Sequence, residues 1–512
     1  MSILKGTLSF LGVFHIVCGE LSQYSFPDNF QFGVSSSAYQ IEGAWNEGGK
    51  GVSIWDHSLH SNPDYVLNKS NGDIACDSYH KWKEDIAMLK NLGVQFYRFS
   101  ISWTRIIPLG YSGSKVNEEG VKYYNDLIDA LLAEGIQPFV TIYHWDLPQT
   151  LENKGGWLNE SIVEDFVYYA KTLFELYGDR VKRWITINEY LQICEYGYSS
   201  ATLAPFLNLA GVGVYQCSHH ALLAHGRVYR LYQNQFKASQ KGEVGSVIQA
   251  FWCEPKTSSM DDQLAAEHYM QFNFGIYAHP IVYGNYPPIM MERIEALSDK
   301  QGFNKSRLPR FTEQQIEMIK GSFDFLGVNH YTTILCSFND NLPQPSLDSD
   351  CGVEISQNST WKGDSLWWLR HVPWGFRKLL VWIKKTYDNP KVIILEGGWS
   401  TDENDLNDVD RVQYYREYLS EMLKAIYEDG CSVIGYAAWS FLDAFEWNSG
   451  YTKKFGLIYV DFGSANRTRI PRKSFNEFRN IIRSNRIPNS SVHLEIYLPV
   501  FYIILCYLLK LI

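Results

Sequence analysis

The sequence lacks three features that would each point to a class of protein. It contains no C-x-x-C pair, so a structural zinc site is not expected. It has no long basic run and a net charge of −10, which argues against nucleic-acid binding because that binding depends on neutralising phosphates. No low-complexity linker and no charge-rich, apolar-poor stretch interrupts residues 24–486, so disorder is excluded for most of the chain. No motif calls for a metal ion or another cofactor, and none is predicted.

Apolar and aromatic residues, by contrast, are plentiful enough for a large core. Of the 512 residues, 46% are hydrophobic and 15% are aromatic. The length alone suggests about three domains of roughly 150 residues, although barrels with long loops run larger as single domains. We predict one domain over residues 20–486.

The first residues are typical of a secretory signal. Lys5 is followed by an apolar run over residues 8–17 and by the small-residue site Val17-Cys18-Gly19. We predict a signal peptide over residues 1–19, with a buried N-terminal helix as the alternative. Secretion would place the protein outside the cell and give meaning to six N-x-[ST] sequons, any of which could also be an unused surface asparagine. They begin at Asn68, Asn159, Asn304, Asn358, Asn466 and Asn489.

The last residues, 487–512, form a hydrophobic tail. Residues 494–512 are nearly all apolar, and the small residues Asn489-Ser490-Ser491 precede them. This pattern is typical of a glycolipid-anchor signal. A membrane-spanning anchor and an extension without function are the alternatives, so attachment to a membrane through this tail stays open.

Nine cysteines are present, of which Cys18 and Cys506 lie in the two terminal segments. The remaining seven are an odd number, which leaves at least one thiol free or paired between chains. Cys336 and Cys351 flank a loop-like stretch rich in Asn, Asp and Pro, and we expect them to form one disulfide.

Eight short β-rich runs alternate with helical stretches. The runs cover residues 30–43, 96–103, 138–145, 183–190, 243–250, 323–331, 391–398 and 433–441. Apolar residues at helical spacing predict helices over residues 77–92, 120–134, 161–177 and 410–429. Eight such units predict an α/β fold, a single (β/α)8 TIM barrel with long βα loops. The loops at 43–76 and 335–374 would build the walls of an active site.

Two carboxylates stand at the ends of predicted strands. Glu189 ends the fourth run and Glu396 ends the seventh. Either alone could belong to a buried ion pair, but two carboxylates facing each other across a barrel mouth suit the cleavage of a glycosidic bond. A separation of about 5 Å would mean retention of configuration at the anomeric carbon, and about 6.5–9.5 Å would mean inversion.

Several long motifs resemble those of glycoside hydrolase family 1, the β-glucosidase family. They are SAYQIEGAW at 37–45, FSISWTRIIP at 99–108, HWDLPQ at 144–149 and FEWNSGYTKKFGLIYVDF at 445–462. The resemblance extends over about residues 24–485 and is closest to animal and insect β-glucosidases and to lactase-like and myrosinase-like members. It implies a (β/α)8 barrel and a retaining mechanism, with Glu189 as acid/base and Glu396 as nucleophile.

The same resemblance implies roles for further residues, each of which could alone be a plain core residue. Sugar hydroxyls both donate and accept hydrogen bonds, so amide, imidazole and carboxyl groups together can satisfy them. The hydroxyl-binding residues are Gln40, His144, Asn188, Glu446 and Trp447. Trp439 is the aromatic platform beneath the sugar. Arg98 and Tyr331 hold the nucleophile, Tyr331 also bordering the substrate, and Asn329 is a polar neighbour. Trp103 and Trp145 lie at or just beyond strand ends and are expected at the same mouth.

The sequence departs from the family pattern at a few positions. Tyr190 stands where the family has proline after the acid/base, and Leu395 and Gly397 replace polar residues beside the nucleophile. Ala444 stands where the family has asparagine. These changes bear on rate and on leaving-group preference, but none removes a carboxylate or a hydroxyl ligand.

The prediction is therefore a glycoside hydrolase with a small glycoside as substrate. In detail, it is a retaining exo-β-glycosidase that hydrolyses terminal β-D-glucosides by a two-carboxylate double displacement. One alternative is a thioglucosidase, although residues 190–204 contain no Lys or Arg for a sulfated aglycone; Arg307 or Lys362 could supply one. Another is a non-catalytic glycan or protein receptor on the same scaffold.

Overall fold

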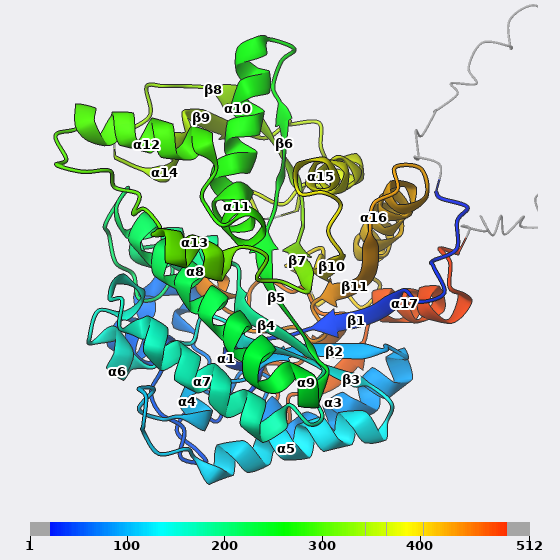
Figure 1. Cartoon of the computed structure of the whole chain (residues 1–512). Helices are drawn as coiled ribbons and strands as arrows, with labels where there is room; N and C mark the ends of the chain where they lie inside the picture. The colour runs from blue at the N-terminus through cyan, green and yellow to red at the C-terminus, as the bar shows by residue number, and fades with distance from the viewer. Residues whose placement is uncertain (1–20, 344, 365, 403, 489–512) are drawn as a thin grey trace, which may run out of the picture.

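Eight parallel strands close into a barrel in the computed structural model, which describes residues 21–343, 345–364, 366–402 and 404–488 (Figure 1). Around the barrel the order is β1, β2, β3, β4, β5, β7, β10 and β11. Their bounds are Gln31–Ser35, Phe96–Ser100, Gln137–Tyr143, Arg183–Asn188, Glu243–Gln249, Phe325–Asn329, Val392–Glu396 and Val433–Trp439. Seven of the eight predicted runs contain one of these strands and the third overlaps β3, which begins one residue earlier, so the (β/α)8 prediction is confirmed.

The inside of the barrel is a packed core, not a channel. A separate apolar cluster fills it with side chains from seven of the eight strands, among them Phe96, Phe139, Phe325 and Leu395. Because parallel strands all point the same way, their carboxyl ends meet on one face, where a site can open above this core.

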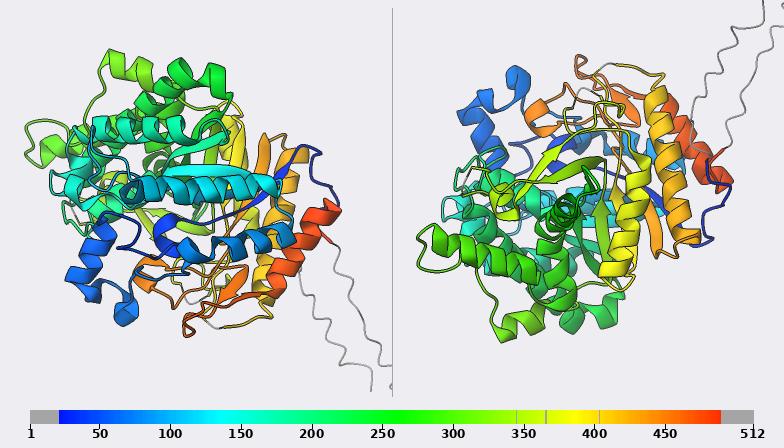
Figure 2. Two further views of the ribbon diagram at one scale, coloured as in Figure 1. Left: turned by 90° about the horizontal axis from the view of Figure 1, so that it is seen from below. Right: turned by 90° about the horizontal axis from the view of Figure 1, so that it is seen from above.

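Helices surround the barrel on its outside (Figure 2). The four predicted helices are α3 (Ser78–Leu92), α5 (Glu118–Ala133), α7 (Ile162–Tyr177) and α16 (Val409–Tyr427). The other helices of eight residues or more are α2 (Ile54–Ser61), α8 (Gly213–Leu231), α10 (Met260–Met270), α11 (Ile276–Tyr283), α12 (Pro288–Lys300), α15 (Pro373–Thr386) and α17 (Lys473–Ser484). Shorter ones are α1 (Ala38–Ile41), α4 (Trp103–Ile106), α6 (Gln149–Glu152), α9 (Lys237–Gln240), α13 (Glu313–Ile319) and α14 (Leu347–Cys351).

The long loops contain structure of their own. A second sheet joins β6 (Trp252–Pro255), β8 (Thr333–Phe338) and β9 (Val353–Ser356) and packs against α10 (Figure 1). Since β6 follows β5 and β8 follows β7, this sheet lies at the carboxyl ends of the barrel strands. A small hairpin of β12 (Ile458–Val460) and β13 (Arg469–Pro471) follows β11. The segment 335–374 is therefore partly a strand and helix layer.

The predicted Cys336–Cys351 disulfide is wrong. Cys336 on β8 bonds to Cys253 on β6, because these two strands pair in parallel and bring the two residues together. A second disulfide joins Cys194 to Cys217. Cys351 ends α14 as a buried free thiol, and among the described residues Cys76 and Cys431 are free as well.

The two ends of the described chain lie side by side next to the start of β1 (Figure 1). Ser25 forms an antiparallel bridge with Arg486, and the amide of Phe26 donates to the carbonyl of Asn485 at 2.9 Å. The predicted signal peptide, residues 1–19, and the tail from Asn489 onward lie outside the described residues, as do Cys18 and Cys506. Within the described ranges, no helix is both long and apolar enough to cross a membrane.

Five of the six sequons lie in the described part of the chain. Asn68, Asn159, Asn304 and Asn466 are exposed, and Asn358 is half-buried. Their use as glycan acceptors stays a prediction.

Candidate active site

The two carboxylates predicted from strand ends lie on the same face of the barrel. Glu396 is the last residue of β10, and Glu189 follows β4 directly. Each side chain belongs to a residue only 4% exposed. Burying two carboxyl groups in one pocket costs free energy unless other groups compensate, so their partners decide what the pair can do.

Glu396 is held by a guanidinium and a phenol. Arg98, from β2, donates to one carboxyl oxygen at 2.5 Å, and Tyr331 donates to the other at 2.7 Å. Burial raises the pKa of Glu396, while the charge and hydrogen bond of Arg98 and the hydrogen bond of Tyr331 act in the opposite direction. Arg98 is itself held by Thr141 at 2.8 Å and by Asn188 at 2.7 Å, so its orientation is fixed.

Glu189 has weaker support. Asn329 donates to it at 2.7 Å, and its pKa is raised well above the usual range, first by burial and then by the negative charge of Glu396. The same Asn329 amide also donates to Oδ1 of Asn188 at 3.2 Å, the oxygen that accepts from Arg98, so it joins Glu189 to the partners of Glu396. Of the two, Glu189 is the group that holds a proton, and Glu396 is the one stabilised as an anion.

The remaining predicted residues lie close to these two carboxyl groups and contact one another. The Gln40 amide donates to the carbonyl of Phe445 at 2.8 Å and lies 3.5 Å from Glu446. Burial and the charge of Glu396 raise the pKa of Glu446 to about 8. The amide of Asn188 lies 3.3 Å from His144, whose pKa is lowered well below its usual value by burial and by Arg98, which makes this imidazole neutral.

Aromatic rings pack beside these polar residues. Trp439 lies 6.0 Å from the His144 ring at 20°, and Trp447 lies 4.5 Å from Trp145. The indole of Trp145 also donates to the carbonyl of Asn188 at 2.8 Å, so it joins the rings to the polar residues. Trp103 is not part of the mouth. It is fully buried and stacks on Tyr169 at 4.7 Å, between the barrel and its helices.

Three residues of this site have unusual backbone angles. Glu189, Trp145 and Trp447 have φ angles of 50°, 75° and 48°, in the left-handed region that side chains other than glycine rarely adopt. Such strain persists only where surrounding contacts impose it, and it is typical of functional sites. The sequence gives no signal for these angles.

Two buried polar atoms of the site make no hydrogen bond with the described part of the chain. Within the described residues, Nδ1 of His144 and Oδ1 of Asn329 are buried and have no hydrogen-bond partner. A proton donor, an anion, neutral hydrogen-bonding groups and flat apolar rings together suit a substrate rich in hydroxyl groups whose bond to a leaving oxygen is cleaved. No group of three or more candidate metal ligands occurs in the described ranges.

Thr141 is a site residue that the sequence reasoning missed. It lies on β3 and fixes Arg98 rather than contacting a carboxylate. A threonine in a β-rich run carries no signal of such a role, because threonine is common in strands.

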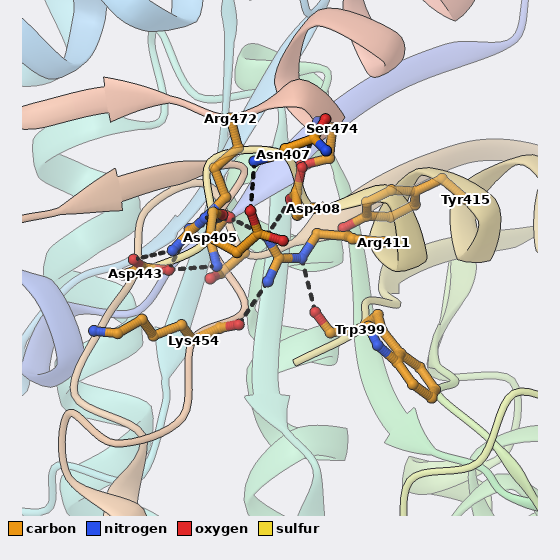
Figure 3. Close-up of polar contacts among 12 residues, drawn as sticks. Trp399, Asp405, Asn407, Asp408, Arg411, Tyr415, Asp443, Lys454, Arg472 and Ser474 are labelled. Carbon is orange, nitrogen blue, oxygen red and sulfur yellow. Dashed lines mark hydrogen bonds and ion pairs between the residues drawn. The ribbon is translucent and has the colours of Figure 1, made fainter. Parts of the chain in front are cut away.

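The loop that carries Glu446 and Trp447 is anchored by a second buried group of charges, which we call the C-terminal ionic cluster: Asp408, Arg411, Asp443 and Arg472. Figure 3 shows these four residues with their polar neighbours. Asp443 accepts hydrogen bonds from both terminal nitrogens of Arg472, at 2.7 and 2.8 Å, and Arg411 donates to Asp408 at 2.5 Å. Two cations therefore pair with two anions. One of these anions, Asp443, lies directly before the loop that carries Glu446 and Trp447.

Comparison with known proteins agrees with this geometry. The family model described as Glycosyl hydrolase family 1 matches residues 22–487. Myrosinase 1 of Brevicoryne brassicae is 45% identical over 90% of this chain and 99% of its own length. Human cytosolic beta-glucosidase is 42% identical over 90% of this chain and 98% of its own length. Human lactase/phlorizin hydrolase is 45% identical over 91% of this chain, which corresponds to 24% of that longer protein.

Solved structures show the same relationship. An aphid myrosinase superposes with a TM-score of 0.87 at 44% identity, covering 90% of this chain and 100% of that one. A rice beta-glucosidase mutant in a covalent complex with Glc superposes with a TM-score of 0.85 at 39% identity, covering 90% and 99%. With the barrel, the two strand-end carboxylates and these matches together, the chain belongs to glycosyl hydrolase family 1 and is a glycoside hydrolase with β-glycosidase function.

Proposed function

We propose that the chain is a retaining exo-β-glycosidase that hydrolyses terminal β-D-glucosides, with Glu189 as acid/base and Glu396 as nucleophile. The observation that carries the proposal is the asymmetry of their partners. Arg98 and Tyr331 stabilise an anion at Glu396, whereas burial and that same anion raise the pKa of Glu189 and keep it protonated.

The reaction proceeds in two displacements. Glu189 gives its proton to the glycosidic oxygen while Glu396 attacks the anomeric carbon, which releases the aglycone and forms a glycosyl ester. Esterification removes the negative charge of Glu396, so one of the causes that raise the pKa of Glu189 disappears. Glu189, now ionised, can take a proton from water as the water attacks the same carbon. The sugar leaves, and both carboxyl groups return to their starting states.

Retention is supported by two features. The negative charge of Glu396 raises the pKa of Glu189, so the two carboxyl groups lie close enough to interact, which favours the shorter of the two separations known for glycosidases. The rice relative is described as holding Glc in a covalent complex, as a glycosyl-enzyme intermediate requires.

Sugar binding would use the remaining polar residues and rings. Gln40 and Glu446 lie together at 3.5 Å and offer an amide and a carboxyl group to sugar hydroxyls. His144 is neutral and can donate or accept, and the face of Trp439 suits the apolar CH face of a pyranose.

A test uses p-nitrophenyl β-D-glucoside with the wild type and Glu396→Gln. We expect the substitution to reduce turnover by about 10⁴-fold or more, because the covalent step loses its nucleophile. Glu477→Gln is a matched control, since Glu477 pairs with Arg416 on the outside of the barrel at 2.7 Å. Equal release of nitrophenol by wild type and Glu396→Gln would refute the assignment. NMR of the first product anomer would show whether configuration is retained.

Thioglucoside hydrolysis is the second candidate, favoured by the 45% identity to an aphid myrosinase. The two cations considered for a sulfated aglycone are already engaged. Arg307 donates two hydrogen bonds to Asp350, both at 2.6 Å, and Lys362 pairs with Asp410 at 2.6 Å. We therefore favour O-glucosides, and kinetic comparison of an O-glucoside with a sulfated thioglucoside decides. The non-catalytic receptor is not retained, because both carboxyl groups stand with their partners in place.

We also propose that the protein enters the secretory pathway and carries N-linked glycans. The exposure of Asn68, Asn159, Asn304 and Asn466 supports this, since an acceptor must be accessible. A loss of apparent mass after N-glycanase treatment of the secreted protein tests it. Release from cells by a phosphoinositide-specific phospholipase would distinguish a glycolipid anchor from a membrane-spanning tail.

A further inference from the structure

The strand that carries the acid/base leaves its ladder just before Glu189. In the pairing of β4 with β5, Ile185 faces Gly245 but the next pair is Asn188 with Val247. Three steps along β4 thus match two along β5, which is a β-bulge. At the bulge, the carbonyl of Ile187 accepts a hydrogen bond from a side chain. The donor is the hydroxyl of Ser246 on β5, at 3.2 Å.

Tyr190 covers this bulge. Its residue is fully buried, its phenol oxygen lies 2.5 Å from Oγ of Ser246, and its ring stacks on Tyr277 at 4.9 Å and 17°. A serine hydroxyl has one hydrogen to donate. Because Ser246 gives that hydrogen to the carbonyl of Ile187, Tyr190 must be the donor in its bond with Ser246.

A second chain of hydrogen bonds fixes the other side of the bulge. Thr186 lies 2.7 Å from Nδ1 of His225, and Nε2 of His225 lies 2.8 Å from the carbonyl of Ser322. Burial lowers the pKa of His225 to about 4, so the ring is neutral and can donate only from Nε2. Thr186 is therefore the donor to Nδ1. The residue before Ile187, Thr186, is thus held by His225, and the residue after it, Asn188, accepts from Arg98.

We propose that Tyr190 is a positioning residue for Glu189, acting through Ser246 and the backbone of the bulge. The φ of 50° at Glu189 needs contacts on both sides to persist, and Tyr190 is the next residue along the chain. Its phenol orients the Ser246 hydroxyl onto Ile187, and its ring holds the turn against Tyr277. Tyr190 makes no contact with the substrate in this role. The proposal rests on Glu189 being the acid/base.

Tyr190→Phe tests the proposal because it keeps the stacked ring and removes the phenol hydroxyl. A displaced acid should matter most when the leaving group needs its proton, since general acid catalysis contributes about 10²–10⁴-fold. We expect kcat/KM for an alkyl β-D-glucoside to fall about 10- to 100-fold, and kcat/KM for 2,4-dinitrophenyl β-D-glucoside to change less than about threefold. Ser246→Ala should show the same pattern.

The ratio of the two rates is measured on one preparation, so it does not depend on the fraction of folded protein. Tyr169→Phe is a matched control, because Tyr169 is also buried, stacks on Trp103 at 4.7 Å and donates its hydroxyl to the carbonyl of Ile101 at 2.9 Å. Its ratio should equal that of the wild type. Equal losses on both substrates in Tyr190→Phe, or no loss on either, would overturn the positioning role alone. A wild type that cleaves neither glycoside would overturn the proposed function and this role with it.

Discussion

The active site and the C-terminal ionic cluster are both buried groups of charges, but their charge balance differs. The ionic cluster pairs Arg411 and Arg472 with Asp408 and Asp443, so its charges cancel. The active site sets Arg98 against three carboxyl groups, those of Glu189, Glu396 and Glu446. Burial raises the pKa values of all three, and the negative charge of Glu396 raises those of Glu189 and Glu446 further.

The difference shows how one molecule uses buried charge for two purposes. Asp443 accepts from Arg472 and from the backbone amide of Gly456 at 3.0 Å, and it thereby anchors a loop. Glu189 receives only one hydrogen bond at 2.7 Å among the described residues and is left able to exchange its proton. A buried carboxylate whose hydrogen bonds and charge are fully paired stabilises the fold, whereas one that is only partly paired can take part in chemistry.

Glu189→Gln tests whether the charges of the active site serve activity. Removing the acid should reduce kcat/KM for an alkyl β-D-glucoside by about 10²–10⁴-fold. Because the pKa of Glu189 is raised, wild-type activity should fall as pH rises through that pKa, and this alkaline limb should vanish in the variant. The thermal midpoint should not fall, since the raised pKa keeps the Glu189 carboxyl group protonated and the substitution replaces it by a neutral amide of similar size. A large loss of stability would show that Glu189 serves the fold.

Arg472→Met tests whether the C-terminal ionic cluster serves stability. The substitution leaves Asp443 buried without its cation, which should cost about 3–5 kcal/mol of unfolding free energy. Urea denaturation measures this. The rate ratio between activated and alkyl glucosides should stay that of the wild type. Arg416→Met is the control, because the Arg416–Glu477 pair is partly exposed and should contribute less than about 1 kcal/mol. Equal losses in the two variants would contradict the distinction.

The smallest effect concerns Glu446 and sharpens the comparison through pH. Its pKa rises from the usual 4.5 to about 8 in the folded protein, so the folded state keeps a proton that the unfolded chain releases. Its contribution to stability is fully present below pH 4.5 and is lost as pH rises towards 8. Glu446→Gln should therefore raise the thermal midpoint by a few degrees at pH 8 and leave it unchanged at pH 4. An equal shift at both pH values would contradict this assignment.

The barrel could be predicted because each strand is an apolar run of the right length, separated from the next by helical spacing. The strand-end position of Glu189 and Glu396 was also visible, since carboxylates rarely end such runs without a purpose. Arg98 was different. It lies inside an aromatic strand, and only the resemblance to a known family indicated its partner.

Other features depend on contacts that no local pattern records. The Cys253–Cys336 disulfide follows from the pairing of two strands of four and six residues, whose cysteines are 83 residues apart in the sequence. Ser246 is an ordinary strand serine until the bulge of β4 brings Ile187 over it. Trp103 lies close to a strand end in sequence, but the short helix α4 begins with it and turns it into the core.

The bridge between Ser25 and Arg486 makes the backbone of the barrel nearly circular. The order in which the eight βα units are translated is then only one of several orders that the same packing could accept. A short linker across this bridge, with new ends opened in an exposed surface loop, would give a circular permutant with the same strand neighbours. The architecture of this molecule thus depends on how the βα units pack around the barrel and not on which unit comes first in the chain.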